Sequence, residues 1–358
     1  MPKSNYYGLI LAGGRGTRFW PRSRRAKAKQ VLSFLGERTL IQQTVDRLRP
    51  VIPPERIWVI TNDHLRAEII QQLPEVPEEQ ILAEPAQRNT APCIGLAAHI
   101  LHSVDPDAVM GVFPADHIIA KPDPYTRLLI PAYEAAESGQ ISVIGIEPRW
   151  AETGYGYVEF TGAAEPESAT PQAVASFREK PDAETAEKFL AAGRFYWNAG
   201  MFFWRADVVL EAFRQFQPKT WSVLAGLPAF SSPQFEVRVA EAFPLCENIS
   251  IDYAVLEKAK NVVGLAAGDI GWSDVGSWDA VYELLPHDAS GNVVVGDALI
   301  ESSSGCYVDA KEAGSFAGLK DLIIVDTPDA LLIADRHRAQ EVGAIVKALE
   351  SRKREDLL

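Results

Sequence analysis

The stretch YGLILAGGRGTRFWPRSR, residues 7–24, predicts a buried strand that leads into a glycine-rich turn. Tyr7 to Ala12 form a continuous apolar run, which is typical of a strand covered on both faces. Three of the next four residues are glycine, and glycines let backbone N–H groups approach a ligand without a Cβ in the way. Seven of the 35 lysines and arginines fall between Arg15 and Lys29. The segment therefore predicts a loop that binds phosphate.

Two well-known phosphate loops are excluded by this stretch. The chain contains no Gly-Lys dipeptide, so it has no Walker A loop. The pair Gly14 and Gly16 is followed by Phe19 where a dinucleotide-binding fingerprint needs a third glycine, which disfavours an NAD-linked dehydrogenase. A glycine-rich turn with a solvated basic face and no ligand is the structural alternative.

Composition limits the remaining function classes. The chain has 358 residues, a formal charge of −13 and 47% hydrophobic residues, which predicts two globular domains. The acidic balance argues against a nucleic-acid partner, which would need a basic face. No apolar window approaches the roughly 18 residues of a membrane span, and no signal peptide is visible. The three cysteines are far apart, which fits neither disulfides nor a zinc site, so we expect a cytoplasmic protein.

Alternation of apolar runs with amphipathic stretches predicts an α/β fold with a mixed, mostly parallel sheet. After Pro286 the pattern changes to short alternating runs between Gly and Asp turns, and Asp335 can cap a final helix from Arg336 to about Glu350. We therefore expect a catalytic domain over 1–285 and a small β-rich domain over 286–358. The expected strands are 7–12, 57–61, 109–113, 141–146, 157–160, 173–178 and 199–204, and the expected helices are 39–48, 64–73, 125–138 and one that Asn89 or Thr90 caps.

Several polar segments follow these elements. The segment PADH, residues 114–117, ends a predicted strand, which is where α/β sheets bind ligands. Taken singly, an aspartate there is more often a turn residue, and EPAQRNT, residues 84–90, is equally well a capped helix start. His99 and His102 share a helix face without a third metal ligand, so we interpret them as structural. The run Phe202 to Trp204 is interpreted as core strand.

The glycine-rich loop resembles the signature of the sugar-1-phosphate nucleotidyltransferases, a strand followed by GGxGTRLxPxS and a lysine about ten residues on. The chain departs from it at Phe19, Arg22 and Ala28. The resemblance implies a Rossmann-like nucleotidyltransferase domain, with Arg18 and Lys29 on the triphosphate. The matching residues are Gly13, Gly14, Gly16, Thr17, Arg18, Pro21, Ser23 and Lys29.

Two further segments extend the resemblance to the nucleotide and its metal. EPxxRNT is similar to the base-reading segment of the mannose-1-phosphate guanylyltransferases, and Glu84 and the Asn89 amide suit the donors and acceptor of guanine. Asp116 and Asp274, the latter in GWSDVGSW, match the family positions that hold Mg²⁺. For His117, a packing or supporting role explains the residue at least as well as a role at the metal. The implied nucleotide-binding residues are Leu11, Ala12, Gly13, Gly14, Gly16, Thr17, Arg18, Lys29, Glu84, Pro85, Asn89, Thr90 and Asp116.

The segments TGYGY, FREKP and WNAGMFFW, which begin at residues 153, 177 and 197, match the sugar side of the same family. The resemblance implies that Glu179 and Asn198 bind sugar hydroxyls, that Gly156 presents backbone to the sugar, and that Lys180 holds its phosphate. Arg18, Lys29, Asp116 and Asp274 are the implied catalytic residues.

The reaction that the resemblance implies is GTP plus mannose 1-phosphate giving GDP-mannose and diphosphate, with Mg²⁺ as cofactor. The tail resembles the short β-helix-like extension of single-function guanylyltransferases, and we expect no isomerase domain in a chain of this length. A homodimer through the edges of that extension is expected. Two alternatives stay open: another sugar 1-phosphate as substrate, or a regulatory subunit that binds nucleotide sugars without turnover.

Overall fold

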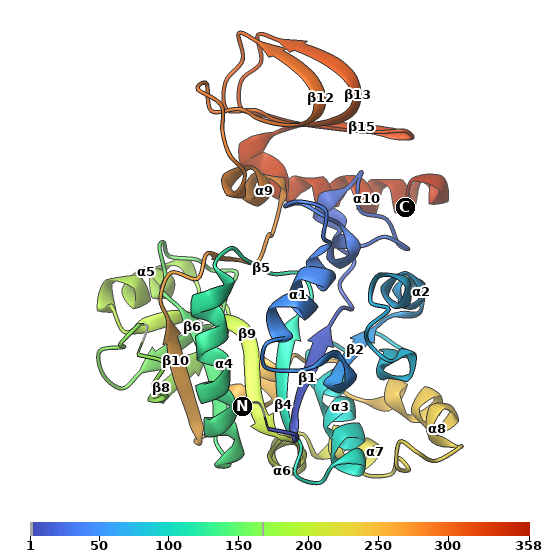
Figure 1. Ribbon diagram of the computed structural model, residues 1–358, viewed down its shortest axis with the longest axis vertical. Coiled ribbons are helices and arrows are strands. Elements are labelled where there is room, and N and C mark those ends of the chain that lie inside the picture. Colours follow the sequence, from blue (N-terminus) through green and yellow to red (C-terminus); the bar gives the residue numbers. More distant parts are fainter. Residues whose placement is uncertain (1–2, 167) are drawn as a thin grey trace.

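A nine-stranded sheet forms the centre of the molecule in the computed structural model, which describes residues 3–166 and 168–358 (Figure 1). The strands β8 and β9 run opposite to the other seven, so the expectation of a mixed, mostly parallel sheet is confirmed. In order across the sheet, the strands are β3 (Ile81–Ala83), β2 (Ile57–Thr61), β1 (Tyr6–Leu11), β4 (Val109–Pro114), β9 (Phe195–Arg205), β6 (Ile141–Ile146), β10 (Val262–Ala267), β8 (Gln172–Arg178) and β7 (Tyr157–Phe160).

The strand β1 lies between β2 and β4 and pairs with both in parallel. Leu9 and Ile10 are fully buried, because helices cover both faces of the sheet. Ile10 is opposite Val59 on β2 and Phe113 on β4, so the three strands end at the same edge. That edge carries the glycine-rich loop and PADH together.

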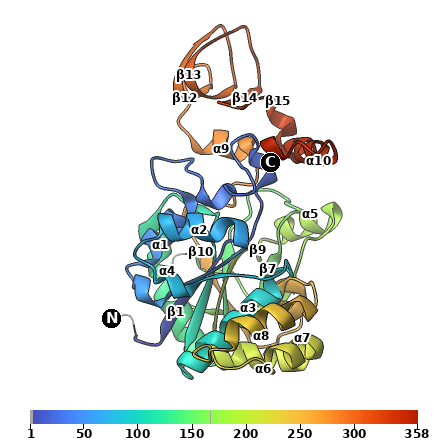
Figure 2. The same ribbon diagram turned by 90° about the vertical axis from the view of Figure 1, so that its right-hand side faces the viewer.

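Two layers of helices enclose the sheet (Figures 1 and 2). The helices α1, α2 and α4 pack into one apolar core, and α3, α6, α7 and α8 into the core on the opposite face. The bounds of the α-helices, including those outside the two layers, are α1 (Leu40–Leu48), α2 (Asp63–Gln72), α3 (Thr90–Val104), α4 (Pro122–Glu137), α5 (Ala183–Ala192), α6 (Ala206–Phe216), α7 (Pro218–Leu224), α8 (Phe235–Ala242), α9 (Trp278–Leu284) and α10 (Val342–Ser351).

Short helical turns and one small ribbon connect these elements. The ribbon pairs β5 (Ile118–Ile119) with β11 (Trp272–Ser273) and so brings PADH beside GWSDVGSW. The turns are η1 (Thr17–Phe19), η2 (Lys29–Val31), η3 (Pro54–Arg56), η4 (Glu78–Gln80), η5 (Phe243–Leu245), the π-helical η6 (Asp252–Leu256), η7 (Arg336–Glu341) and η8 (Glu355–Leu357).

A second, four-stranded sheet stands above the large one at the C-terminal end (Figures 1 and 2). Its first three strands pair in parallel in sequence order, the arrangement of successive coils in a β-helix, and the fourth pairs antiparallel to the third. This agrees with the β-rich domain expected after residue 285. The strands are β12 (Val293–Glu301), β13 (Tyr307–Ala317), β14 (Leu322–Thr327) and β15 (Ala330–Asp335).

One apolar core joins this second sheet to the glycine-rich loop. Trp278 is fully buried between Phe19 and Tyr307, and its Nε1 donates to the carbonyl of Trp20 at 3.1 Å. Trp20 in turn donates to the carbonyl of Leu357 at 3.0 Å. Burying aromatic side chains of this size contributes about 2 to 3 kcal/mol each. The second sheet is therefore fixed onto the loop, and a domain boundary at 285/286 stays a prediction.

The expected single helix from Arg336 to Glu350 is wrong. Asp335 does cap the segment by accepting from the His337 amide, but Arg338 has φ −110° and ψ 18°, which is not helical. The chain therefore forms η7 first and starts α10 at Val342.

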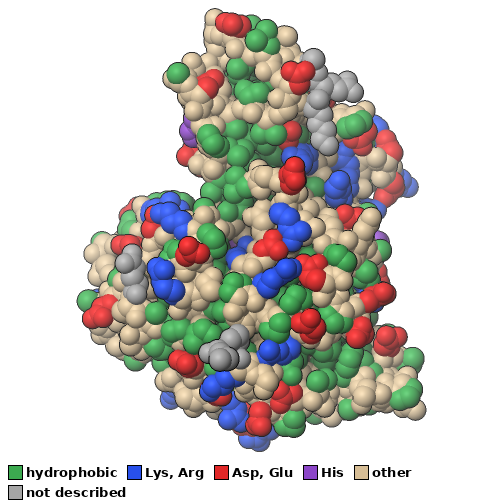
Figure 3. All heavy atoms as spheres, viewed as in Figure 1, with side chains coloured by type: hydrophobic (Ala, Val, Ile, Leu, Met, Phe, Trp, Pro, Cys, Tyr) green, Lys and Arg blue, Asp and Glu red, His purple; other side chains and the backbone are tan. Residues whose placement is uncertain are grey.

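Acidic and basic side chains are interspersed over the face in Figure 3, with no extended basic stripe on that face. Among the described residues, no helix is both long and apolar enough to span a membrane.

Candidate active site

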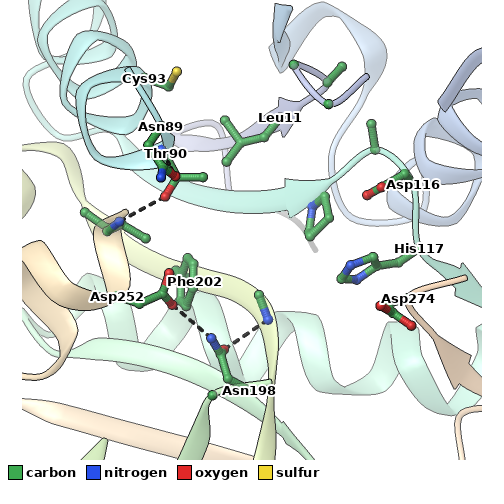
Figure 4. A pocket seen from close by; sticks show the side chains of 18 of the residues that line it. Leu11, Asn89, Thr90, Cys93, Asp116, His117, Asn198, Phe202, Asp252 and Asp274 are labelled. Atoms are coloured by element: carbon green, nitrogen blue, oxygen red, sulfur yellow. Dashed lines mark hydrogen bonds between the residues drawn. The ribbon is translucent and has the colours of Figure 1, made fainter. Parts of the chain in front are cut away.

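A cavity of about 780 Å³ opens at the carboxyl edge of β1 and β4. The glycine-rich loop and the start of α3 form one end, and the residues that follow β8 together with the middle of β9 form the other. Figure 4 shows Asp116, His117 and Asp274 together on one side of it, with Asn198 and Asp252 facing them across the space. Three predicted groups of residues thus meet in one cavity.

The glycine-rich loop is held in shape by Gln30, a residue that the sequence analysis did not single out. Its side chain is 2% exposed and donates to the carbonyls of Ala12 at 2.6 Å and Gly14 at 3.0 Å. Gly16 has φ +60°, and a Cβ there would lie 2.5 Å from Cβ of Lys29. Only glycine at position 16 leaves room for Lys29, whose backbone therefore packs directly against the loop.

Lys29 connects the two predicted metal ligands. Its Nζ donates to Oδ2 of Asp116 at 2.9 Å and to the backbone carbonyl of Asp274 at 2.5 Å. Lys29 is only 6% exposed. Burial would raise the pKa of Asp116, but the Lys29 ammonium outweighs it and holds that pKa below its usual value. Asp116 is therefore a carboxylate at neutral pH.

Tyr155 and His117 support this carboxylate pair. Tyr155 donates its hydroxyl hydrogen to Oδ1 of Asp274 at 2.7 Å. Trp272 donates to Nδ1 of His117 at 3.2 Å, so that nitrogen is an acceptor and the ring is neutral. Burial lowers the pKa of His117 to about 4, in agreement with its expected role as a packing residue.

The end of the cavity that the sequence analysis predicts to bind the base contains a buried carboxyl. Glu84 is 9% exposed, and burial raises its pKa. Its Oε2 accepts from the Cys93 thiol at 2.9 Å, while Oε1 faces the Gly13 backbone. Asn89 caps α3 by accepting from the Thr90 amide at 2.8 Å, and Thr90 accepts from the Ile251 amide at 2.9 Å. Cys93 had no signal in the sequence beyond its place in an apolar helix.

The opposite end presents the predicted sugar-binding residues. Asn198 donates to Oδ1 of Asp252 at 3.0 Å and accepts from the Gly200 amide at 3.0 Å. Glu179 is 8% exposed, and its Oε1 pairs with Nζ of Lys180 at 3.0 Å. Its buried Oε2 has no hydrogen-bond partner among the residues that the structure describes. A buried carboxylate oxygen without a donor is costly, so Oε2 of Glu179 is suited to accept a hydrogen bond from a ligand hydroxyl.

Asp252 was not predicted, because nothing in the sequence distinguishes it from a helix-start aspartate. Burial, and next the charge of Glu179, raises its pKa to about 7. An unfolded aspartate titrates near 3.9. The stability that protonated Asp252 contributes is therefore fully present below about pH 4 and is lost as the pH rises through 7.

We expect Asp252→Asn to become more stable relative to the wild type as the pH rises from 5 to 8, since asparagine cannot ionise. Urea unfolding at both pH values measures this difference, with the exposed Asp123→Asn as control. An equal difference in the free energy of unfolding at pH 5 and pH 8 would show that Asp252 titrates normally.

The predicted nucleotide-binding residues separate into two places. Leu11, Ala12, Gly13, Gly14, Glu84, Asn89, Thr90 and Asp116 line the main cavity, as do all four predicted sugar-side residues and Asp274. Gly16, Thr17, Arg18 and Lys29 line a second cavity that adjoins it, together with α10. Pro85 lines neither of the two and lies in a separate surface hollow.

The outcome for the other predicted residues is mixed. Nε2 of His99 donates to the Pro228 carbonyl at 2.9 Å, in agreement with a structural role. Phe203 and Trp204 are fully buried core residues, as expected. Phe202 differs from these two core residues because its side chain also lines the main cavity.

The donor set fits a magnesium ion bound together with a nucleotide. Among the described residues there is no cluster of three or more His, Cys, Asp or Glu that could hold a metal. Asp116 and Asp274 provide two carboxylates on one cavity, and phosphate oxygens and water would complete an octahedral shell.

Comparison with known proteins identifies two matching regions. The family model described as Nucleotidyl transferase matches residues 7–291, and that of the MannoseP isomerase/GMP-like beta-helix domain matches residues 291–349. The mannose-1-phosphate guanylyltransferase of Escherichia coli (strain K12) is 40% identical, over 98% of this chain and 75% of its own length. That of Klebsiella pneumoniae is 39% identical, over 97% and 74%.

A solved structure is similar over nearly the whole chain. The crystal structure of mannose-1-phosphate geranyltransferase from Thermus thermophilus has a TM-score of 0.83 and 31% identity, and covers 97% of this chain and 99% of its own. The similarity includes both the large sheet and the four-stranded one.

Proposed function

The chain belongs to the nucleotidyl transferase family, and from this premise we propose that it is a mannose-1-phosphate guanylyltransferase, which converts GTP and mannose 1-phosphate into GDP-mannose and diphosphate. One observation carries the proposal. Asp116 and Asp274, joined by Lys29, lie in the cavity between a base-binding end and a hydroxyl-binding end. This is the placement that transfer between two anionic substrates requires.

The reaction follows from this arrangement. A sugar phosphate has a second pKa near 6, so its oxygen is already anionic at neutral pH and needs no general base. That oxygen attacks the α-phosphorus of GTP, the bond from this phosphorus to the α,β-bridging oxygen breaks, and diphosphate leaves with the electron pair. The anomeric C–O bond stays intact. The protein then has to orient the substrates and offset their negative charge.

Nucleotidyl transferases of this family generally use a divalent metal ion. We propose Mg²⁺, held by Asp116 and Asp274, which neutralises charge on the phosphate oxygens when bound. Lys29 fixes both residues from the protein side through its two hydrogen bonds. Oδ1 of Asp274 accepts from the Tyr155 hydroxyl, whereas Oδ2 accepts from no donor among the described residues and would be the freer oxygen to hold the ion.

We propose guanine as the base because Glu84 supplies an acceptor at the base-binding end. Its Oε1 faces the cavity beside Gly13 while Oε2 is occupied by Cys93. Guanine offers N1–H and N2–H as adjacent donors, and adenine has no donor at these positions. A carboxylate acceptor therefore discriminates between the two purines.

Substrate choice is tested by diphosphate release from GTP, ATP, UTP and CTP, each with mannose 1-phosphate or glucose 1-phosphate, with and without Mg²⁺. Release that requires GTP, mannose 1-phosphate and metal is expected. Turnover with another pair would contradict the assignment of Glu84 or of the sugar-binding end. Binding of GDP-mannose without any turnover would identify a regulatory subunit instead.

We expect Gly156→Ala to raise the KM for mannose 1-phosphate by about 10-fold or more and to leave the KM for GTP unchanged. An added Cβ would collide with Oε2 of Glu179 and would lie 3.3 Å from Cβ of Asn198, so the carboxyl must move. Gly162→Ala, where the added Cβ meets no atom within 4 Å, is the matched control. Equal KM values for mannose 1-phosphate in both variants would exclude Glu179 from sugar binding.

We also propose a cytoplasmic location and a homodimer. All three cysteines are free and buried, as suits a reducing compartment. Leu299, Leu331 and Ile333 of the four-stranded sheet are between 56% and 62% exposed, and a second copy would cover them. Light scattering at several concentrations tests the dimer; a constant monomer mass up to 100-fold above the working concentration would contradict it.

A further inference from the structure

The second cavity, of about 430 Å³, is closed on one side by the C-terminal helix α10. It shares Gly14, Arg15 and Asp116 with the main cavity, so the two adjoin at the metal-binding carboxylate. A Cβ added to Gly343 would lie 3.6 Å from Cγ of Arg18, so the α10 backbone packs directly on the glycine-rich loop. Figures 1 and 2 show α10 lying over this loop, more than 300 residues away in sequence.

The lining of this cavity has more cations than carboxylates. Two cations have carboxylate partners: Arg15 pairs with Glu350 at 2.5 Å, and Lys29 with Asp116 at 2.9 Å. Arg18 hydrogen-bonds instead to the neutral Gln340, at 2.7 Å. Lys347, exposed on α10, forms no ion pair within the described ranges. Four cations and two carboxylates line the cavity, so its lining carries a net charge of two positive units.

The resemblance already implies that Arg18 and Lys29, which line this cavity, bind the triphosphate of GTP. We propose that the C-terminal segment contributes directly to the binding of these phosphates and of the diphosphate that leaves, through Lys347 and Gln340. Lys347 binds the phosphate oxygens, and Gln340 is a positioning residue that orients Arg18. The inference rests on the proposed guanylyl transfer, in which attack at the α-phosphorus in the main cavity drives diphosphate away from the sugar. Because the second cavity adjoins the main one, it lies where the departing diphosphate can be bound.

Gln340 suits this task because its amide is uncharged. Its Oε1 accepts one N–H of Arg18 and fixes the guanidinium without cancelling its charge, so the remaining N–H groups stay available to phosphate. A carboxylate at position 340 would hold Arg18 in the same place but compete with phosphate for it. The variant Gln340→Glu therefore tests the effect of the Arg18 charge on phosphate binding separately from the position of the guanidinium.

Calorimetric titration of the full chain with inorganic diphosphate and Mg²⁺ tests the site without turnover. We expect Lys347→Ala and Gln340→Glu each to raise the Kd for diphosphate by about 5- to 10-fold. Arg352→Ala removes a cation one residue beyond the end of α10 that does not line the cavity, and should leave this Kd unchanged. Equal Kd values for Lys347→Ala and Arg352→Ala would overturn the role of Lys347.

The reverse reaction separates this site from general damage. Lys347→Ala should raise the KM for diphosphate and leave the KM for GDP-mannose unchanged; a parallel rise of both would contradict a specific diphosphate site. Failure of the proposed function is distinguishable, because Lys347-dependent diphosphate binding without GDP-mannose synthesis would refute the transfer and retain the site. Synthesis of GDP-mannose with no effect of Lys347 on diphosphate would refute the site alone.

Discussion

Replacing Lys29 by methionine is expected to lower kcat for GDP-mannose synthesis by about 10²- to 10³-fold. The Lys29 ammonium contacts the Asp116 carboxylate and the Asp274 carbonyl, and Lys29 also lines the second cavity. Its charge therefore acts where phosphate charge is proposed to develop. Methionine keeps the apolar stem of the side chain in its buried position and removes only the charge and the hydrogen bonds. The measurement is the initial rate of diphosphate release at saturating substrates.

Two control variants separate catalysis from folding in this experiment. Lys27→Met changes an exposed lysine two residues away and should keep wild-type kcat. Lys29→Met leaves Asp116 without its partner, which is expected to destabilise the fold, so the double variant Lys29→Met/Asp116→Asn should recover the urea midpoint but not the activity. A kcat within threefold of wild type in the folded single variant would contradict the role given to Lys29.

Asp274→Asn is expected to lose about 10²- to 10³-fold in kcat while remaining folded. The asparagine Oδ1 can still accept from the Tyr155 hydroxyl, so the local structure is retained while the negative charge is lost. The rate should be measured over a range of Mg²⁺ concentrations, because a metal ligand affects the apparent affinity for the ion as well as the rate.

Asp269→Asn is the matched control for this variant. Asp269 lies five residues earlier, is 75% exposed and pairs with Lys121 outside both cavities. It should behave as wild type. Near-normal turnover of Asp274→Asn at saturating Mg²⁺ would remove Asp274 from the metal site.

The sequence predicts the part of the site that lies at strand ends. The runs that form β1 and β4 are apolar on both faces, so their parallel pairing and common end could be expected, and with them the proximity of the loop to Asp116. Asp274 could be predicted only from the resemblance to a family motif. The structure brings it close to Asp116 because β5 pairs with β11. Glu179 likewise follows the last residue of β8, whereas Asn198 lies inside β9.

What the sequence could not predict depends on contacts between distant segments. Asp252 becomes a site residue only because η6 packs beside β9 and Glu179, and its local pattern is that of an ordinary helix start. Gln340 and Lys347 reach the loop only because the Trp278 core fixes the second sheet against it. The break at Arg338, which separates η7 from α10, has no glycine or proline to mark it.

We propose that the sugar phosphate attacks the α-phosphorus of GTP in this cavity. The most direct test of this attack uses mannose 1-phosphate labelled with ¹⁸O in the oxygen that joins C1 to phosphorus, with GTP and Mg²⁺, and mass analysis of the products. We predict GDP-mannose and diphosphate in equal amounts, with all of the label in GDP-mannose. Label in any other product, or GTP consumption without GDP-mannose, would contradict the account.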